Sequence, residues 1–359
     1  GDFLVAVAEH QPGYVALDLI MPGMDGIEVL RRLADTRCAS GIILTSGMGE
    51  RVLESARQTA RERGLDILGV LPKPFKPQLL RELLGRVPRG QGASPAPAAH
   101  ADAVLTAAEL GEALAEGQVS IVAQPKLDLA TRAVVGAEAL ARWNHPTRGF
   151  VRPDHFVALA EATGQMDRLT EVVLDQALAW FARSPLRKRG SLAVNLSTSC
   201  LADVGLADRV QSACRDYEVP AERLVLEITE SSAMDRTADT FDTLTRLRLK
   251  GFHLSVDDFG TGYSSLSQLS QIPFSALKID RGFVSGAPTQ PRKRAMIETS
   301  LDLARKLGLA VVAEGVETID EWQLLAQLGC DYAQGYLISA PVPGEQLPDA
   351  IQRWRQTHH

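Results

Sequence analysis

The chain has 359 residues, more than one ordinary domain needs, and 45% of them are apolar, which is enough to build more than one core. Its 38 basic and 44 acidic residues give a net charge of −6, which argues against a nucleic-acid-binding protein with its basic surface stripe. No apolar run approaches the ~20 residues of a membrane-spanning helix, no secretory leader is visible, and the four scattered cysteines lack zinc or thioredoxin spacing. We therefore expect a soluble cytoplasmic protein with reduced thiols and no membrane contact.

Residues 1–87 alternate between the patterns of strands and helices. Short apolar runs predict strands at 14–20, 41–47 and 66–75. Helical spacing is found at 25–36 and 52–64. This order indicates an α/β domain with a parallel sheet.

Residues 88–103 are rich in proline, glycine and alanine and cannot bury a core, so they predict a linker. Residues 104–359 then form a second domain, which opens with a helical capping box at Thr106 and Glu109. Helical patterns such as 166–183, 292–308 and 319–329 separate eight apolar runs. These runs predict strands near 119–125, 134–142, 191–195, 223–228, 253–258, 275–280, 310–314 and 332–337.

Eight strands that alternate with helices over about 250 residues predict a TIM-like (β/α)₈ barrel. An open doubly wound sheet is the alternative, but no G-x-G-x-x-G follows the first strand of this domain. The overall class is therefore α/β, with a barrel behind a smaller domain.

Nearly every predicted barrel strand ends in an acid, an amide or a lysine. These residues are Glu138, Asn195, Glu227, Glu230, Asp257, Asp258, Lys278, Asp280, Glu314, Glu317 and Gln334. The carboxyl ends of barrel strands meet at one mouth, where two like charges 4 Å apart repel by about 4 kcal/mol at an effective dielectric near 20. Protons relieve one or two such acids, whereas divalent cations relieve the whole cluster. Oxygen ligands without histidine favour Mg²⁺ or Mn²⁺ over zinc.

Each of these residues alone has an ordinary explanation. The pair Asp257–Asp258 is typical of a strand end followed by a turn, and Lys278 is compatible with a solvated strand edge. Glu314 and Glu317 are compatible with exposed loop acids. The hypothesis of a metal site rests on the recurrence of polar groups at successive strand ends.

The motifs "EALARW" (138–143), "NLS" (195–197), "LEITES" (226–231), "DDFGTGYSSL" (257–266), "LKID" (277–280), "AEGVET" (313–318) and "QGY" (334–336) resemble those of EAL-domain phosphodiesterases. The resemblance runs in order over about residues 105–345. Members of that family hydrolyse the bacterial second messenger cyclic di-GMP to the linear dinucleotide pGpG. The resemblance therefore implies a hydrolase with a (β/α)₈ barrel.

The resemblance also implies two metal ions, Mg²⁺ or Mn²⁺, with Ca²⁺ inhibitory because it prefers more ligands at longer distances. The first ion would be held by Glu138, Asn195, Glu227 and Asp257. The second would be held by Asp257, Asp258 and Glu314. Lys278 resembles the lysine that touches the attacking water. Glu314 is either a general base or a second-metal ligand, and Glu138, Lys278 and Glu314 are the implied catalytic residues.

Other residues match the substrate positions of the family. Arg142 resembles the arginine that pairs with the ligand's phosphate, for which a planar guanidinium is well suited. Glu230 resembles the glutamate that anchors the mobile loop after Asp258 and bears on dimerisation, so we expect a homodimer through this domain. Further substrate positions are implied at Gln124, Asp280, Glu317 and Gln334.

Residues 1–87 resemble a response-regulator receiver domain. The stretch "LDLIMPGMDG" places Asp18 where the phospho-acceptor aspartate stands, and Thr45 and Lys73 match the partners of the phosphoryl group. The resemblance implies a sensor histidine kinase as partner and a cis Lys73–Pro74 bond.

The receiver departs from its family in two ways. Only 17 residues precede Asp18, and 1–11 match the helix before the phospho-acceptor strand. The first strand, the first helix and the second strand are therefore expected to be missing, together with the magnesium-binding acid pair. Val70 stands where the family has an aromatic switch residue.

Two other functions compete with hydrolysis. A non-catalytic cyclic di-GMP receptor would signal by binding alone, but such proteins usually lack some metal acids, and this chain has all of them. A two-component regulator that acts only by protein contact would have no need of them. No Gly-Gly-Asp-Glu-Phe stretch occurs, so the sequence carries no built-in cyclase.

Overall fold

The computed structural model contains two compact units, Gly1–Ala99 and His100–His359. In the first unit it describes residues 2–10, 12–19, 21, 26–36, 38, 40–46, 57, 60, 63–73 and 80, and in the second 105–230, 238–260 and 271–358. The predicted linker 88–103, the Lys73–Pro74 bond and loop residues 261–265 lie outside these ranges. The domain boundaries 87/88 and 103/104 stay predictions.

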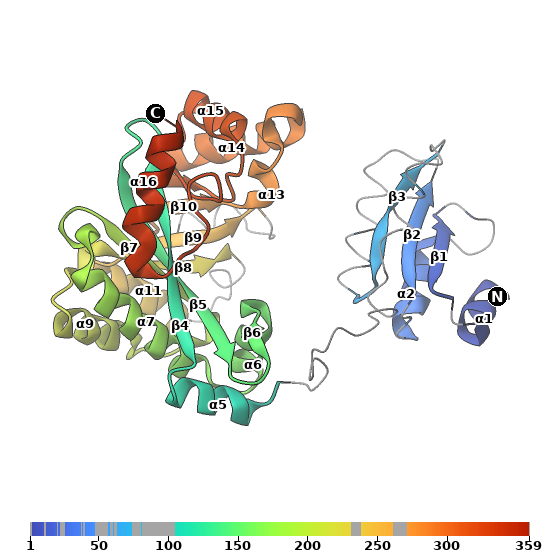
Figure 1. Cartoon of the computed structure of the whole chain (residues 1–359), viewed down its shortest axis with the longest axis horizontal. Helices are drawn as coiled ribbons and strands as arrows, with labels where there is room; N and C mark the ends of the chain where they lie inside the picture. The colour runs from blue at the N-terminus through green and yellow to red at the C-terminus, as the bar shows by residue number, and fades with distance from the viewer. Residues whose placement is uncertain are drawn as a thin grey trace. The chain divides into compact units, whose positions relative to one another are not determined.

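The first unit is a small parallel sheet with helices. Its strands β1 (Tyr14–Asp18), β2 (Gly41–Ser46) and β3 (Ile67–Pro72) lie in the order β1-β2-β3 (Figure 1). Helix α1 (Asp2–His10) precedes β1, and α2 (Gly26–Asp35) follows it. Buried apolar side chains from the strands and α2, such as Leu17, Leu33 and Leu44, form its core. The predicted α/β arrangement is confirmed for these elements.

The second unit is a closed barrel of eight strands. Its sheet runs in the order β4-β12-β11-β10-β9-β8-β7-β5, and pairing of β4 with β5 closes it. The barrel strands are β4 (Val119–Asp128), β5 (Val134–His145), β7 (Ser191–Leu196), β8 (Leu224–Thr229), β9 (His253–Phe259), β10 (Ala276–Ile279), β11 (Ala310–Ala313) and β12 (Tyr332–Ala333). A short strand β6 (Gly149–Val151) extends the sheet beyond β5. The predicted barrel is confirmed.

One strand of the barrel runs against the others. β4 is antiparallel to both β5 and β12, whereas the remaining barrel pairs are parallel. The reason is local, because only residues 129–133 separate β4 from β5, and a parallel crossover needs a dozen or more residues. Asp128 Oδ1 shapes this turn by accepting hydrogen bonds from the backbone N–H of Ala130 and Thr131 at 3.0 and 2.7 Å.

Helices cover the outside of the barrel (Figure 1). The predicted helix at 166–183 is confirmed residue for residue, and the two near 292–308 and 319–329 are confirmed within one residue. None of the helices in the described ranges is both long and apolar enough to cross a bilayer. The helices are α5 (Ala107–Ala115), α6 (Pro153–Ala162), α7 (Met166–Arg183), α8 (Thr198–Leu201), α9 (Leu206–Asp216), α11 (Ala238–Leu249), α13 (Arg281–Val284), α14 (Pro291–Leu307), α15 (Ile319–Leu328) and α16 (Leu347–His358).

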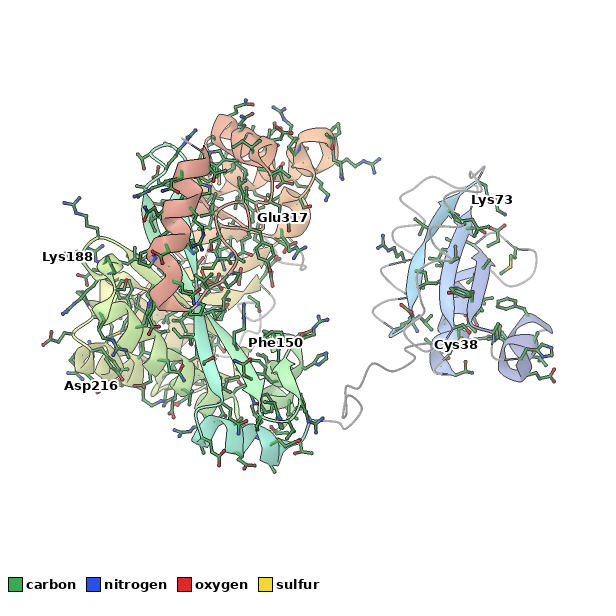
Figure 2. All side chains as sticks on the ribbon, viewed as in Figure 1. Cys38, Lys73, Phe150, Lys188, Asp216 and Glu317 are labelled. Atoms are coloured by element: carbon green, nitrogen blue, oxygen red, sulfur yellow. The ribbon has the colours of Figure 1, made fainter. Side chains whose placement is uncertain are left out.

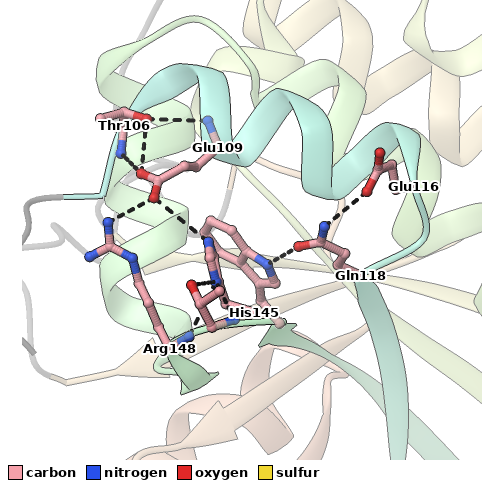
Figure 3. Close-up of polar contacts among 8 residues, drawn as sticks. Thr106, Glu109, Glu116, Gln118, His145 and Arg148 are labelled. Carbon is pink, nitrogen blue, oxygen red and sulfur yellow. Dashed lines mark hydrogen bonds and ion pairs between the residues drawn. The ribbon is translucent and has the colours of Figure 1, made fainter. Parts of the chain in front are cut away.

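The start of α5 ties the entry of the unit to strand β5. The Glu109 carboxylate accepts a hydrogen bond from the Thr106 backbone N–H at 2.8 Å, and the Glu109 backbone N–H donates to the Thr106 hydroxyl at 3.2 Å. These are the two bonds of the predicted capping box (Figure 3). The same carboxylate pairs with Arg148 at 2.7 Å and lies 3.7 Å from His145 Nε2. The hydrogen bonds from Arg148 first, and then from Thr106, lower the pKa of Glu109 to about 2.

Gly335 allows the end of β12 to pass against the loop after β11. A Cβ at this position would lie 2.2 Å from the Val316 nitrogen and 2.3 Å from its oxygen, and both are backbone atoms that cannot move aside. Next to Gly335, the Val316 N–H donates a hydrogen bond to the Gln334 carbonyl at 3.1 Å. Gln334 and Gly335 are thus held together by close backbone packing.

We expect Gly335→Ala to lower the free energy of unfolding by more than about 2 kcal/mol, because the backbone must shift to admit a methyl group. Thermal or urea unfolding of the purified protein measures the loss. Gly111→Ala in α5 is the matched control: its Cβ meets only the end of the Gln165 side chain at 3.3 Å, and alanine favours a helix. Equal stability of the two variants would contradict the steric argument.

Candidate active site

The polar strand ends of the barrel meet around one buried lysine. Lys278 lies on β10 and is only 1% exposed. Its ammonium lies 2.6 Å from Glu314 Oε1, 2.7 Å from Glu227 Oε2, 3.2 Å from Asp257 Oδ1 and 3.5 Å from Glu138 Oε2. Residues 138 and 314 are far apart in the chain, so barrel closure brings these groups together. The structure therefore gathers the predicted acids at one place.

The cluster places four carboxyl groups around one ammonium, and burial and these charges shift the pKa values of its members. Burial, followed by repulsion from Glu138, raises the pKa of Glu227 well above its usual value despite Lys278. Burial raises the pKa of Glu314 to about 7, against the pull of Lys278. Burial alone would lower the pKa of Lys278, but the surrounding carboxylates, Glu138 foremost, raise it well above its usual value.

Glu138 differs from the other acids because amides surround it. Asn195 Nδ2 donates to its Oε1 at 2.8 Å, and Gln334 Nε2 donates to its Oε2 at 2.7 Å. Burial would raise the pKa of Glu138, but Lys278 and these two amides lower it below its usual value. Gln334 also donates to Gln124 Oε1 at 3.0 Å, which brings Gln124 into the same network. Glu138 is therefore held ionised in a fixed orientation.

The adjacent acids Asp257 and Asp258 reach the same site through a β-bulge. On β9 the residues from Val256 to Phe259 face only Leu277 to Ile279 of β10, and Asp258 has a left-handed φ of 54°. Neighbouring residues of a regular strand point to opposite faces, so the bulge is what turns both side chains to one side. One carboxylate oxygen each of Asp257, Asp258 and Glu314 lies within 4.8 Å of the others. Oxygen atoms so arranged fit a hard dication.

Of the predicted substrate residues, Gln334 and Gln124 join the network of Glu138, whereas Arg142, Asp280 and Glu317 make other contacts. Arg142 is partly buried on β5, and its Nη1 donates to the Ala141 carbonyl at 2.8 Å. Burial lowers its pKa, and among the described residues no carboxylate forms an ion pair with it. Asp280 caps α13 by accepting from the Gly282 N–H at 2.8 Å. Glu317 is exposed in the loop after β11 (Figure 2).

Glu230 links two segments of the mouth. It follows β8, is 3% exposed, and its Oε2 accepts from the Gly260 backbone N–H at 2.7 Å. Gly260 is the last described residue of the segment that leaves β9, and the role of Glu230 as anchor of the following loop stays a prediction. Its expected bearing on dimerisation stays a prediction.

Sequence reasoning missed three residues at or near the site. Tyr336, in the "QGY" motif, is 66% exposed and interacts electrostatically with Arg142. Glu321 accepts from the backbone N–H groups of Gly286, Glu317 and Thr318, which fixes the loop that carries Glu317. Lys126 lies two residues after Gln124 on β4, so the period of two along a strand could have found it.

The N-terminal unit brings its predicted residues together as well. Lys73, after β3, pairs with Asp18, at the end of β1, with 2.5 Å between Nζ and Oδ2 (Figure 2 labels Lys73). Thr45 lies on β2 opposite Asp18, and its hydroxyl donates to the Leu17 carbonyl at 3.4 Å. Asp18 and Lys73 are both partly exposed, so this pair is accessible at the edge of the sheet where the strands end.

Two family models match the chain. The EAL domain matches residues 107–341, which include all the acids around Lys278. The response regulator receiver domain matches residues 1–85.

Curated relatives agree with these matches. The cyclic di-GMP phosphodiesterase RocR of Pseudomonas aeruginosa is 36% identical over 335 residues, which cover 92% of this chain and 85% of RocR. The cyclic di-GMP phosphodiesterase NbdA of the same organism is 41% identical over 249 residues, which cover 69% of this chain but only 32% of NbdA.

Solved structures agree in the barrel. The cyclic di-GMP complex of the PaMucR phosphodiesterase superposes with a TM-score of 0.64 at 39% identity and covers 67% of this chain and 98% of that one. The EAL domain of Mycobacterium smegmatis DcpA gives a TM-score of 0.56 at 32% identity, covering 66% of this chain and 97% of that one. The chain therefore belongs to the EAL domain family and carries a response regulator receiver domain ahead of its EAL domain.

Proposed function

We propose that this protein is a metal-dependent phosphodiesterase that hydrolyses cyclic di-GMP to linear pGpG. The observation that carries the proposal is the group of acids around Lys278 at the mouth of the barrel. RocR, a cyclic di-GMP phosphodiesterase, matches most of the chain, and the PaMucR structure holds cyclic di-GMP on the same fold. A receptor that only bound the nucleotide would not need so many costly carboxylates.

The donor set of the site fits two hard dications, Mg²⁺ or Mn²⁺. Asp257, Asp258 and Glu314 would hold one of them, supported by the close approach of their oxygens. The other ion would be held by Glu138, Asn195, Glu227 and Asp257, so both ions would share Asp257. When bound, a pair of such ions lowers the pKa of a water and stabilises the attacking and leaving oxygens of an in-line displacement.

The chain's own residues would orient the reacting groups. Water attacks one phosphorus and gives up one proton, the bond from that phosphorus to a ribose 3′ oxygen breaks, and the leaving oxygen takes up one proton. Lys278 holds Glu138 and Glu227 in place by direct ion pairs and would contact the attacking water. Arg142 is a guanidinium without a carboxylate partner among the described residues, and so is suited to a phosphate. Gln124, Asp280, Glu317 and Gln334 would contact the rest of the nucleotide.

The receiver would regulate this activity by phosphorylation. Asp18 would accept a phosphoryl group from a sensor histidine kinase. The Lys73 ammonium, which already pairs with Asp18, would then pair with the phosphoryl oxygens. Homodimerisation through the EAL domain and a cytoplasmic location remain part of the proposal.

Purified protein with cyclic di-GMP and Mg²⁺ should release pGpG, and Glu227→Gln should lower kcat by about a hundredfold or more, because it removes an anionic oxygen from the centre of the site. Chromatography of the products measures both. Ca²⁺ in place of Mg²⁺ should suppress turnover.

Glu298→Gln on α14 is the matched control for this experiment, because it removes the same charge from a surface ion pair with Arg294. It should keep wild-type turnover. Turnover of Glu227→Gln within a few-fold of wild type would contradict the two-ion site. Nucleotide that binds to the wild type but stays intact would instead indicate a receptor.

Without metal, the protein should lose stability as the pH rises toward 7, in part because of Glu314. Its folded pKa of about 7 lies above the ordinary value of 4.5, so between these values only the folded state holds the proton. The free energy of unfolding then falls by about 1.4 kcal/mol per pH unit from this group and levels off above its folded pKa. Thermal unfolding in EDTA measures the slope. Glu314→Gln should flatten it, and an unchanged slope would exclude Glu314 as the titrating group.

Arg142→Met should raise KM for cyclic di-GMP by about tenfold or more and change kcat little, because a phosphate contact is lost in both ground and transition states. Steady-state kinetics separate the two constants. Arg152→Met, at an exposed arginine paired with Asp154, is the control and should leave KM unchanged. A fall in kcat at constant KM would place Arg142 in the chemical step instead.

A further inference from the structure

A buried serine lies beside the acid cluster inside the barrel. Side chains alternate between the two faces of a strand, so the residue two positions before an inward acid also points inward. Ser255 stands two positions before Asp257 on β9, and Val256 between them belongs to the apolar core that includes the surrounding helices. The register of β8 and β9 has no shift from residue 253 to 257 and places Ser255 next to Glu227. Neighbouring strands lie about 4.8 Å apart, so the two side chains are close neighbours in the interior.

The hydroxyl of Ser255 is buried and has no hydrogen-bond partner within the described part of the chain. The residue is 1% exposed, and its Oγ neither donates to nor accepts from any group there. Other hydroxyls of this unit find partners in the protein. Ser275, just before β10, donates to the Leu254 carbonyl at 2.9 Å, and Ser300 on α14 donates to a backbone carbonyl at 2.9 Å. A buried hydroxyl without a hydrogen bond is unfavourable, and an ordered internal water is the usual partner where the protein offers none.

The two strands beside Ser255 indicate which group shares such a water. On the β10 side the neighbour is Ala276, whose methyl group cannot hydrogen-bond. On the β8 side the neighbour is Glu227, whose carboxylate Ser255 does not reach directly. An internal water needs two or more polar partners, and one water can bridge two groups that are too far apart to bond. The serine hydroxyl and the glutamate carboxylate supply these partners.

We propose that Ser255 is a positioning residue of the EAL site: its hydroxyl binds an internal water that donates a hydrogen bond to Glu227 from the β9 side. Glu227 is then held from two directions, by this water and by the Lys278 ammonium, which lies 2.7 Å from its Oε2. Hydrogen bonds that orient a metal-binding carboxylate raise its affinity for the ion, because less of its freedom remains to be lost on binding. This inference rests on the proposed metal site.

The test uses the full chain without nucleotide and Mg²⁺ alone as the probe. Ser255→Ala removes the hydroxyl and adds no volume, so the variant fits the interior. It should bind Mg²⁺ about tenfold more weakly by calorimetry, because Glu227 loses the contact that orients it. Its melting temperature in EDTA should fall, whereas removal of a hydroxyl that bound nothing would raise it. A crystal structure of the wild type should show a water within hydrogen-bond distance of Ser255 Oγ and of a Glu227 carboxylate oxygen.

Ser275→Ala is the matched control, because it removes a hydroxyl that bonds to the Leu254 carbonyl and to none of the acids. It should lower the melting temperature and leave Mg²⁺ affinity unchanged. If the wild type binds Mg²⁺ and Ser255→Ala binds it equally well, this inference alone is overturned, whatever the melting temperature does. A wild-type crystal structure with no water at Ser255 would overturn it too. A wild type that neither binds Mg²⁺ nor hydrolyses cyclic di-GMP would overturn the proposed metal site together with it.

Discussion

The buried ammonium of Lys278 is the interaction on which the site depends. A lysine at 1% exposure is stable only when acids pair with it, and the acids in turn come from β5, β8 and β9 and from the residue that follows β11. The pairing leaves an excess of negative groups, since four carboxyl groups contact one ammonium. That excess is what gives the barrel mouth its capacity for protons or dications.

The second constraint is the backbone of β9. A left-handed φ at a non-glycine residue costs of order 1–2 kcal/mol, and Asp258 adopts it at the position where β9 carries one residue more than β10. The surrounding barrel stabilises this conformation, because β9 is paired on both sides by β8 and β10. In return, two consecutive carboxylates reach Glu314 from the same strand. The strained conformation of Asp258 thus brings two neighbouring carboxylates into the same group of oxygen ligands.

The fold and most of the site could be predicted because their signals are local in sequence. Apolar runs of strand length, each ended by a polar residue, placed the eight barrel strands and indicated that Glu138, Glu227, Asp257 and Lys278 would meet. The reversed direction of β4 follows from a short hairpin that the strand pattern alone does not distinguish from a crossover. The bulge at Asp258 and the place of Ser255 beside Glu227 depend on register between strands, which one sequence does not encode in any contiguous motif.

Closure of the barrel and assembly of the site are one event. The seam of the barrel runs along β4, which is paired in antiparallel fashion to β5 on one side and β12 on the other. Across this seam Gln334 of the β12 end donates to Gln124 of β4 and to Glu138 of β5, so a single amide bridges all three strands. Gly335 permits the close backbone approach that keeps this amide in place. An open barrel would separate Glu138 from Lys278 and leave the ammonium without one of its four acids. The ion pairs of the site therefore stabilise the closed barrel.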